Sequence, residues 1–127
     1  MRLTLPTLGA LLILVGASCR PAPSTLRPAY TESQVEKKVR NAPGNPQPQY
    51  PEMFLAGKGD GKVLVQFVVD VNGKADMSTL KVLESSHELF TREVRRVLPQ
   101  MRFFPAEVGD KKVRQVVQQP FFFRFDM

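Results

Sequence analysis

The chain is poor in the residues that build covalent or metal-based cross-links. Its 127 residues include one Cys and one His, and no Trp. A single Cys excludes an intramolecular disulfide, and a zinc site built from several His or from a Cys pair is also excluded. The fold must therefore depend on an apolar core, for which 43% hydrophobic residues and nine Phe are available. The length allows one domain with an appendage.

Residues arranged for catalysis are also scarce. Glu84, His87 and Glu88 fall close together at an expected strand-to-helix corner and could imitate an acid–base cluster. Glu88, however, is expected to take part in capping the helix, and His87 to lie exposed in its first turn. No nucleophile stands at motif spacing, and no Gly-rich phosphate loop follows a strand. We therefore predict that the protein is not an enzyme and uses neither a cofactor nor a metal.

Residues 1–18 are expected to be a signal peptide. The apolar run from Leu8 to Ser18 has eleven residues, whereas a membrane-spanning helix needs about 17–25. Small residues precede Cys19, as in the bacterial lipoprotein box, so Cys19 is the predicted lipidation site. The box usually has Leu three residues before the Cys, where this chain has Gly16. Ordinary signal cleavage and retention of a short anchor are the alternatives.

Residues 19–45 are expected to form a Pro-rich, basic tether. Five basic and two acidic residues lie between Arg20 and Asn45, whereas residues 46–127 carry twelve basic and ten acidic ones. The globular part is thus nearly balanced, and no basic face for nucleic acid is expected. The basic excess of the tether could contact anionic lipid headgroups or acidic cell-wall polymer, or could simply be solvated.

Two conformations are open for the second half of this tether. Thr31 to Gln34 has the spacing of a capping box, and Val35 and Val39 lie four residues apart. A short helix from Glu32 to Arg40 would use both features. An extended strand lying on the domain is the alternative. The preceding Arg20–Tyr30 stretch is rich in Pro, Ala and Ser and is expected to be extended and unpacked.

The clearest element of the domain is a β-hairpin. Pro51 to Ala56 could first form one helical turn, which the following glycines would end. Val and Phe then recur at every second position from Lys62 to Val71, the period of a strand. Asn72-Gly73 is the strongest short hairpin signal. The returning strand is expected from Met77 to Glu84.

A helix and a third strand follow the hairpin. Ser85 is expected to cap the helix, with Glu88 completing a capping box, and Pro99 to end the helix near Leu98. Val113 to Phe125 is the predicted last strand, after a turn at Gly109-Asp110. Pro120 interrupts its hydrogen-bond ladder, which places the strand at a sheet edge or a bulge. The apolar stripe of the helix consists of Phe90, Val94, Val97, Leu98 and Met101.

In this order and spacing, the residues resemble a known family, the C-terminal domain of the energy transducer TonB. The resemblance covers about Gln47 to Phe125. It implies an α+β fold over residues 46–127, with a small three-stranded antiparallel sheet (β-β-α-β) packed on one helix. The motifs are Gln47-Pro48-Gln49-Tyr50-Pro51, Asp70-Val71-Asn72-Gly73-Lys74, Leu89-Phe90-Thr91-Arg92-Glu93-Val94, Arg102-Phe103-Phe104-Pro105-Ala106 and the closing Val113–Phe125 strand.

The resemblance also implies a partner and a binding surface. Family members dock on TonB-dependent outer-membrane receptors, whose short N-terminal box adds as a strand to an open sheet edge. Tyr50 is expected to pin the preceding chain to the core. Formation of a homodimer through the open edge is left undecided. The expected partner-binding residues are Gln47, Pro48 and Gln49, and Val113, Arg114, Gln115, Val116, Val117, Gln118 and Gln119 along the edge.

Three functions remain open at this point. The first is a periplasmic, lipid-anchored protein that binds a receptor or a related envelope partner without transmitting force, since the tether reaches only about 80 Å in polyproline-II geometry. Arg20 beside Cys19, in place of the Asp that often signals inner-membrane retention, slightly favours the outer membrane. The second is a full energy transducer whose uncleaved anchor couples to the inner-membrane proton-driven motor proteins. The third is a structural cell-envelope protein that binds peptidoglycan through its basic residues.

Overall fold

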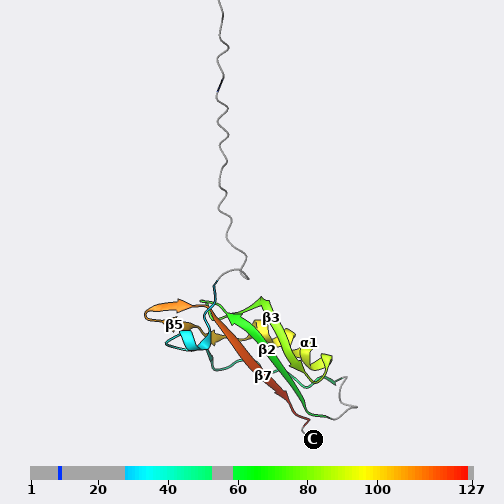
Figure 1. Cartoon of the computed structure of the whole chain (residues 1–127). Helices are drawn as coiled ribbons and strands as arrows, with labels where there is room; N and C mark the ends of the chain where they lie inside the picture. The colour runs from blue at the N-terminus through cyan, green and yellow to red at the C-terminus, as the bar shows by residue number, and fades with distance from the viewer. Residues whose placement is uncertain (1–8, 10–27, 53–58, 126–127) are drawn as a thin grey trace, which may run out of the picture.

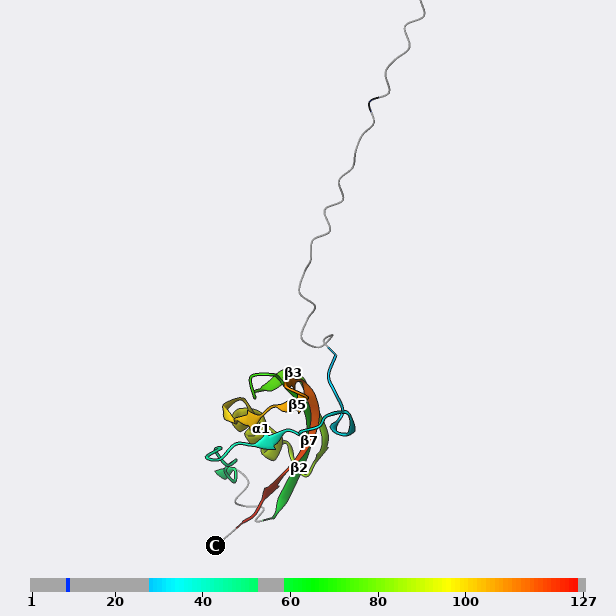
Figure 2. The same cartoon turned by 90° about the vertical axis from the view of Figure 1, so that its left-hand side faces the viewer.

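The structure, a computed structural model, describes Gly9 and residues 28–52 and 59–125. Its centre is an antiparallel sheet in the order β3-β2-β7, formed by β2 (Gly61–Val69), β3 (Ala75–Ser85) and β7 (Gln115–Phe123). Helix α1 (Glu88–Val97) covers one face of this sheet (Figures 1 and 2). The α+β architecture and the β-β-α-β order of these four elements are confirmed. Except for Gly9, the predicted signal peptide lies outside the described residues, as do Cys19 and most of the helical turn expected from Pro51 to Ala56.

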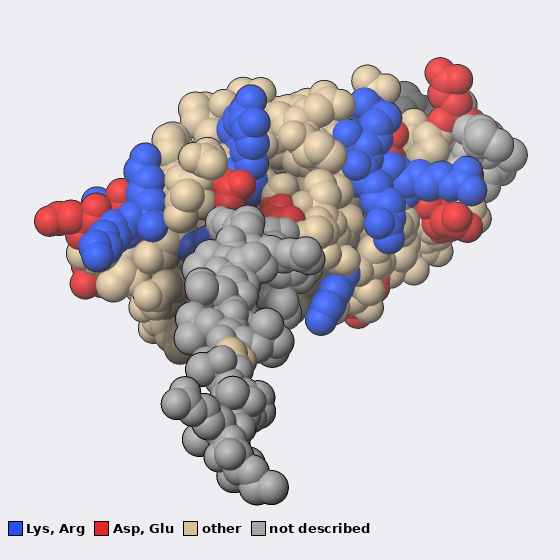
Figure 3. All heavy atoms as spheres, turned by 90° about the horizontal axis from the view of Figure 1, so that it is seen from above, with Lys and Arg blue, Asp and Glu red and all other residues tan. Residues whose placement is uncertain are grey.

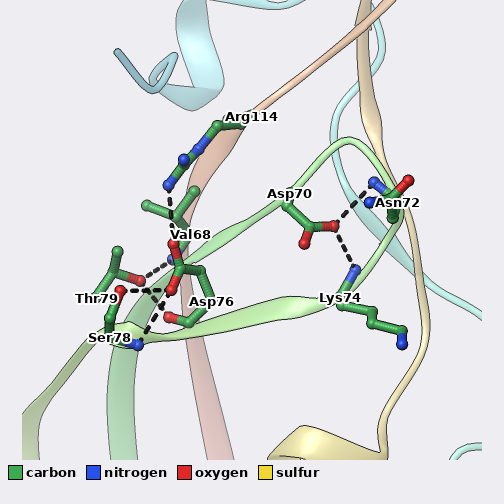
Figure 4. Close-up of polar contacts among 8 residues, drawn as sticks. All are labelled: Val68, Asp70, Asn72, Lys74, Asp76, Ser78, Thr79 and Arg114. Carbon is green, nitrogen blue, oxygen red and sulfur yellow. Dashed lines mark hydrogen bonds and ion pairs between the residues drawn. The ribbon is translucent and has the colours of Figure 1, made fainter. Parts of the chain in front are cut away.

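The turn between β2 and β3 is held by one carboxylate. The side chain of Asp70 accepts hydrogen bonds from the backbone N–H groups of Asn72 (2.8 Å) and Lys74 (3.0 Å) (Figure 4). Gly73 has a φ of 79°, a conformation that side-chain-bearing residues rarely adopt. A Cβ at this position would lie 2.1 Å from the carbonyl oxygen of Phe103. The predicted hairpin therefore forms, and the segment after the helix packs directly on its turn.

Helix α1 begins two residues later than the capping prediction placed it. Its N-cap is His87, whose Nδ1 accepts the backbone N–H of Leu89 at 3.1 Å. The prediction that Ser85 caps the helix was wrong because β3 continues to Ser85, which pairs with Val63. The Ser85 hydroxyl instead donates to the carbonyl of His87 at 2.9 Å. At the other end, Pro99 lies in the 3-10 turn Leu98–Gln100, so the helix ends as predicted.

Phe and Val side chains fill the core between sheet and helix. All five residues of the predicted helical stripe are buried. The rings of Phe90 on α1 and Phe123 on β7 lie 4.7 Å apart between centroids. Gly61 is required beneath Phe90, because a Cβ there would lie 2.2 Å from its ring. The buried Phe residues are Phe67, Phe90, Phe103, Phe121 and Phe123.

Two small strand pairs are added to this frame. β5 (Ala106–Val108) and β6 (Lys111–Val113) form a hairpin around Gly109, and β4 (Phe103–Phe104) pairs with β1 (Arg40–Asn41). The prediction of one strand from Val113 to Phe125 was therefore wrong at both ends. Val113 pairs with Ala106 in the hairpin, and the chain joins β2 only from Gln115.

The segment before the domain lies on it in an extended form. Glu32–Gln34 make a single 3-10 turn with the predicted Thr31–Gln34 capping box. The chain then pairs with the domain through a bridge between Lys37 and Glu107 and through β1. Of the two conformations left open by the sequence, the extended strand is thus the observed one. Within the described residues, no helix is both long and apolar enough to cross a membrane.

Candidate functional site

The edge of β7 that faces away from β2 is the first part of the candidate site. The β2–β7 register runs without a shift from Gly61–Phe123 to Val69–Gln115. The backbone N–H of Val116 points away from β2, since it donates to the carbonyl of Tyr30 at 2.9 Å. Backbone groups alternate in direction along an antiparallel strand, so those of Gln118, Pro120 and Phe122 also point outwards.

This alternation explains how a proline is tolerated in β7. Pro120 occupies an outward position, where the N–H group that it lacks would have faced away from β2. The prediction that the strand lies at an edge is confirmed. The prediction that Pro120 interrupts the ladder was wrong, because the missing donor lies on the unpaired side, and pairing with β2 continues through Leu64–Pro120.

A groove of about 400 Å³ lies beside this edge. One wall is the segment from Asn41 to Pro48, and the other is Gln119 to Phe122 of β7, with Met101 also in the lining. The groove therefore brings Gln47 and Pro48 together with Gln119, which are far apart in the sequence. These three belong to the predicted partner-binding set.

The rest of the Gln47–Pro51 motif is held against the helix and core. The backbone N–H of Gln49 donates to the carboxylate of Glu93 on α1 at 3.0 Å. A side-chain hydrogen bond from Arg96, together with this backbone bond, lowers the pKa of Glu93, although partial burial opposes the shift. Tyr50 donates to the carbonyl of Gly59 at 2.6 Å, and its ring packs edge-on against two Phe rings. Tyr50 thus pins the chain to the core, as expected.

The predicted edge residues have different surroundings. Arg114 is mostly buried and pairs with Asp76 of β3 at 3.1 Å (Figure 4). Gln115 is buried, and its side-chain oxygen accepts the N–H of Val39 at 2.9 Å. Gln118 is exposed and donates to the side chain of Gln66 at 3.2 Å. Val113 lies in β6 and pairs with Ala106 of β5, whereas Val116 and Val117 are half-buried.

Two contacts at the edge of β7, those of Phe122 and Tyr30, were not predicted from the sequence. Phe122 is 63% exposed, the largest exposed fraction among the described large hydrophobic residues, and lies under the ammonium of Lys62 at 6.0 Å. Its position could have been inferred, since the alternation that buries Phe121 and Phe123 turns Phe122 outwards. The contact of Tyr30 with β7 has no such local signal.

The three residues that could imitate a catalytic cluster have structural contacts. The His87 ring caps α1, Glu84 pairs with Lys62 at 3.4 Å, and Glu88 pairs with Arg92 at 3.4 Å. On the face shown in Figure 3, Lys and Arg side chains lie in separate groups with acidic side chains beside several of them. The charge of that face is therefore mixed.

This geometry defines a class of small α+β domains, in which one helix packs on a three-stranded antiparallel sheet with an exposed edge strand. The family described as Gram-negative bacterial TonB protein C-terminal matches residues 46–125. The chain belongs to this family of TonB C-terminal domains. The TonB family is non-enzymatic, in line with the prediction that the chain is not an enzyme.

Two curated relatives and one solved structure support the assignment. Protein TonB of Pseudomonas aeruginosa is 36% identical over 80 residues, which are 62% of this chain and 23% of the relative. Protein TonB of Yersinia enterocolitica is 31% identical over 93 residues, which are 72% of this chain and 34% of the relative. The solution NMR structure of the P. aeruginosa TonB C-terminal domain matches with a TM-score of 0.57 and 33% identity, covering 71% of this chain and 89% of that one. The aligned part thus spans about a quarter to a third of the curated relatives.

Proposed function

We propose that this protein is a periplasmic protein-binding module that takes an extended strand of a TonB-dependent outer-membrane receptor onto β7. One observation carries the proposal: the outward edge of β7, from Val116 to Phe122, lies beside the groove. This groove is lined by Gln47, Pro48 and Gln119. Family membership supports the class of partner.

Backbone groups on this edge are suited to strand addition. The N–H and C=O of Gln118 and of Phe122 point outwards, and Val116 and Pro120 add outward carbonyls. Main-chain bonds of this kind supply affinity in strand-addition interfaces, while pockets for alternate side chains supply specificity. The edge from Val116 to Phe122 is about 20 Å long at ~3.4 Å per residue.

β7 is a better acceptor than β3, the other edge strand. β3 has two irregularities in its pairing with β2, at Leu64/Val65 and at Gln66/Val68. Such bulges twist an edge and hinder addition of a further strand. β7 pairs with β2 over nine residues without a shift, so its free side presents a regular row of backbone groups.

The two parts of the predicted contact set then have separate roles. Gln47 and Gln119 lie on opposite walls of the groove and would contact the side chains of the added strand. Gln49 would act through its backbone, which Glu93 holds against α1. Arg114 and Gln115 would position the start of β7 through their bonds to Asp76 and Val39.

A substitution that removes one outward donor tests the proposal. In Gln118→Pro the outward N–H is lost while the backbone bonds between β7 and β2 remain, and Val117 before it keeps the extended backbone that a following proline needs. The side-chain bond from Gln118 to Gln66 is lost in this variant and equally in Gln118→Ala. A receptor-box peptide titrated into the purified protein should shift the NMR signals of β7, and its binding should be lost in this variant. Gln118→Ala, which keeps the N–H, is the matched control and should bind. Absence of binding by the unsubstituted protein would sink the proposal.

We also propose that residues 1–18 are removed as a signal peptide and that Cys19 carries a lipid that anchors the protein in an envelope membrane. The supporting observation is the short apolar run that ends in small residues before Cys19. Metabolic labelling with a radioactive fatty acid should label the protein, and the label should disappear in Cys19→Ala. An intact mass without lipid would contradict this.

A full energy transducer is the second candidate. The observation in its favour is that both curated relatives are TonB proteins much longer than the aligned region. In that case the N-terminal segment stays uncleaved and couples to the inner-membrane motor. An unlabelled, unprocessed protein in the inner-membrane fraction would support this candidate against the lipoprotein.

A further inference from the structure

The chain already occupies part of its own β7 edge. The backbone N–H of Tyr30 donates to the carbonyl of Arg114 at 2.8 Å, and the N–H of Val116 donates to the carbonyl of Tyr30 at 2.9 Å. Tyr30 thereby forms a parallel bridge opposite Gln115. These are the bonds that an added strand would make at the start of β7.

The segment is fastened much more firmly after Tyr30 than at it. The N–H groups of Glu36 and Lys37 both donate to the carbonyl of Glu107 at 3.0 Å, and the N–H of Glu107 donates back to Lys37 at 2.9 Å. Val39 is bound to the buried Gln115 side chain, and β1 pairs with β4. Residues 36–41 therefore act as a fixed attachment.

Between the two contacts, the chain closes on itself. The backbone N–H of Thr31 is bound to the side chain of Gln34 at 2.9 Å, and the N–H of Gln34 is bound to the carbonyl of Thr31 at 3.0 Å. Thr31, Glu32, Ser33 and Gln34 are all exposed. Tyr30 is 39% exposed. Tyr30 can therefore leave β7 while the attachment at residues 36–41 stays in place.

We propose that residues 28–34 are a built-in competitor for the partner edge of β7. With Tyr30 in place, the Arg114 carbonyl and the Val116 N–H are occupied, so a partner strand keeps only the Val116 carbonyl and the outward groups of Gln118–Phe122. A strand that also pairs at Arg114 and Val116 must displace Tyr30. This inference rests on the proposed strand addition at β7. It adds that the affinity for a partner strand depends on how far the strand extends along β7.

The size of the effect follows from the two bonds that compete. Each backbone hydrogen bond makes a small net contribution in water, and the fraction of molecules with a free edge scales the apparent affinity directly. Loss of one of the two bonds should therefore tighten binding of a long strand about 5-fold. It should leave a strand confined to Gln118–Phe122 unchanged.

Tyr30→Pro is the test variant, because proline removes the N–H that donates to Arg114, one of the two bonds that hold residue 30 on β7, and so weakens the bridge that also protects the Val116 N–H. Glu32→Pro is the matched control: it places a proline at the first position of the 3-10 turn, where proline is tolerated. Thr31 before it has φ −83° and ψ 164°, which suit a residue preceding proline. The control loses only an exposed ion pair to Lys38, which contributes little.

Two measurements on the full chain decide the proposal. In hydrogen exchange, the Val116 amide should be protected in the wild type and in Glu32→Pro, and should exchange faster in Tyr30→Pro. In titrations, a nine-residue receptor-box peptide should bind Tyr30→Pro about 5-fold more tightly than either of the other two proteins. A five-residue version of the peptide should bind all three alike.

The failures of the two proposals are distinguishable. Equal binding of the long peptide by wild type and Tyr30→Pro, or an unprotected Val116 amide in the wild type, overturns the competitor alone. Binding of neither peptide to any of the three proteins overturns strand addition at β7, and the competitor proposal falls with it.

Discussion

Separating Asp76 from Arg114 should destabilise the domain more than any exposed ion pair does. The two side chains are 15% and 11% exposed, and their charged atoms lie 3.1 Å apart. Removing one partner of a buried pair costs about 3–5 kcal/mol, because the other charge is left without compensation. Here the Asp76 carboxylate also accepts bonds from the N–H and hydroxyl of Ser78, and Nε of Arg114 is buried without a hydrogen-bond partner. Both features reduce the net value of the pair, so we expect a loss of about 2–3 kcal/mol for Asp76→Asn or Arg114→Met.

A double-mutant cycle measures this interaction. Urea denaturation of the wild type, both single variants and the double variant should give a coupling free energy of about 2 kcal/mol. Glu84→Gln is the matched control, because its pair with Lys62 at 3.4 Å is about half exposed and should be worth less than about 0.5 kcal/mol. A coupling between Asp76 and Arg114 no larger than that of the exposed pair would refute the reasoning.

Three further predictions concern the turn, the Tyr pin and the helix. Gly73→Ala should lower the melting temperature and destabilise the domain by about 2 kcal/mol or more, because it combines a positive φ with a Cβ against the carbonyl of Phe103; an unchanged melting temperature would contradict this. Tyr50→Phe should cost about 1 kcal/mol in urea denaturation by removing the hydrogen bond of its hydroxyl, while the edge contacts of its ring should persist in NMR. The hydrogen bond from Arg96 lowers the pKa of Glu93. The ionised Glu93 should therefore stabilise the folded state at pH values above the ordinary carboxyl pKa, and this stabilisation should be lost as the pH falls through the lowered pKa. Glu93→Gln should therefore flatten the decline of stability below about pH 5, and an identical decline in both proteins would count against this role.

The parts of the fold that follow from short-range patterns were predictable. Strand alternation and Asn72-Gly73 located the β2–β3 hairpin, and the helical spacing that starts at Phe90 located the buried face of α1. Pro120 indicated an edge strand. Each of these depends on residues a few positions apart, whose side-chain directions the backbone period determines.

The predicted element boundaries were wrong where the local sequence pattern favoured one structure and a contact with a residue distant in the sequence favoured another. Ser85 has the residue type of an N-cap, yet its pairing with Val63 keeps it in β3, and His87 caps the helix instead. Val113 continues the apolar pattern of the last strand, yet the tight turn at Gly109 pairs it with Ala106. In both cases the winning contact comes from pairing in the tertiary fold.

The sequence by itself determined the class of this protein: a small α+β domain with a Phe-rich core and the ordered motifs of the TonB C-terminal family. Only the tertiary structure decided which backbone groups of β7 face outwards, that Gln47 and Gln119 share one groove, and that Tyr30 occupies the start of the edge. The physical reason is range. Periodicity specifies which way a side chain points within one element. The pairing of Tyr30 with β7, in contrast, depends on backbone N–H and C=O groups. Every residue except proline carries both groups, so the sequence does not indicate which residues will pair.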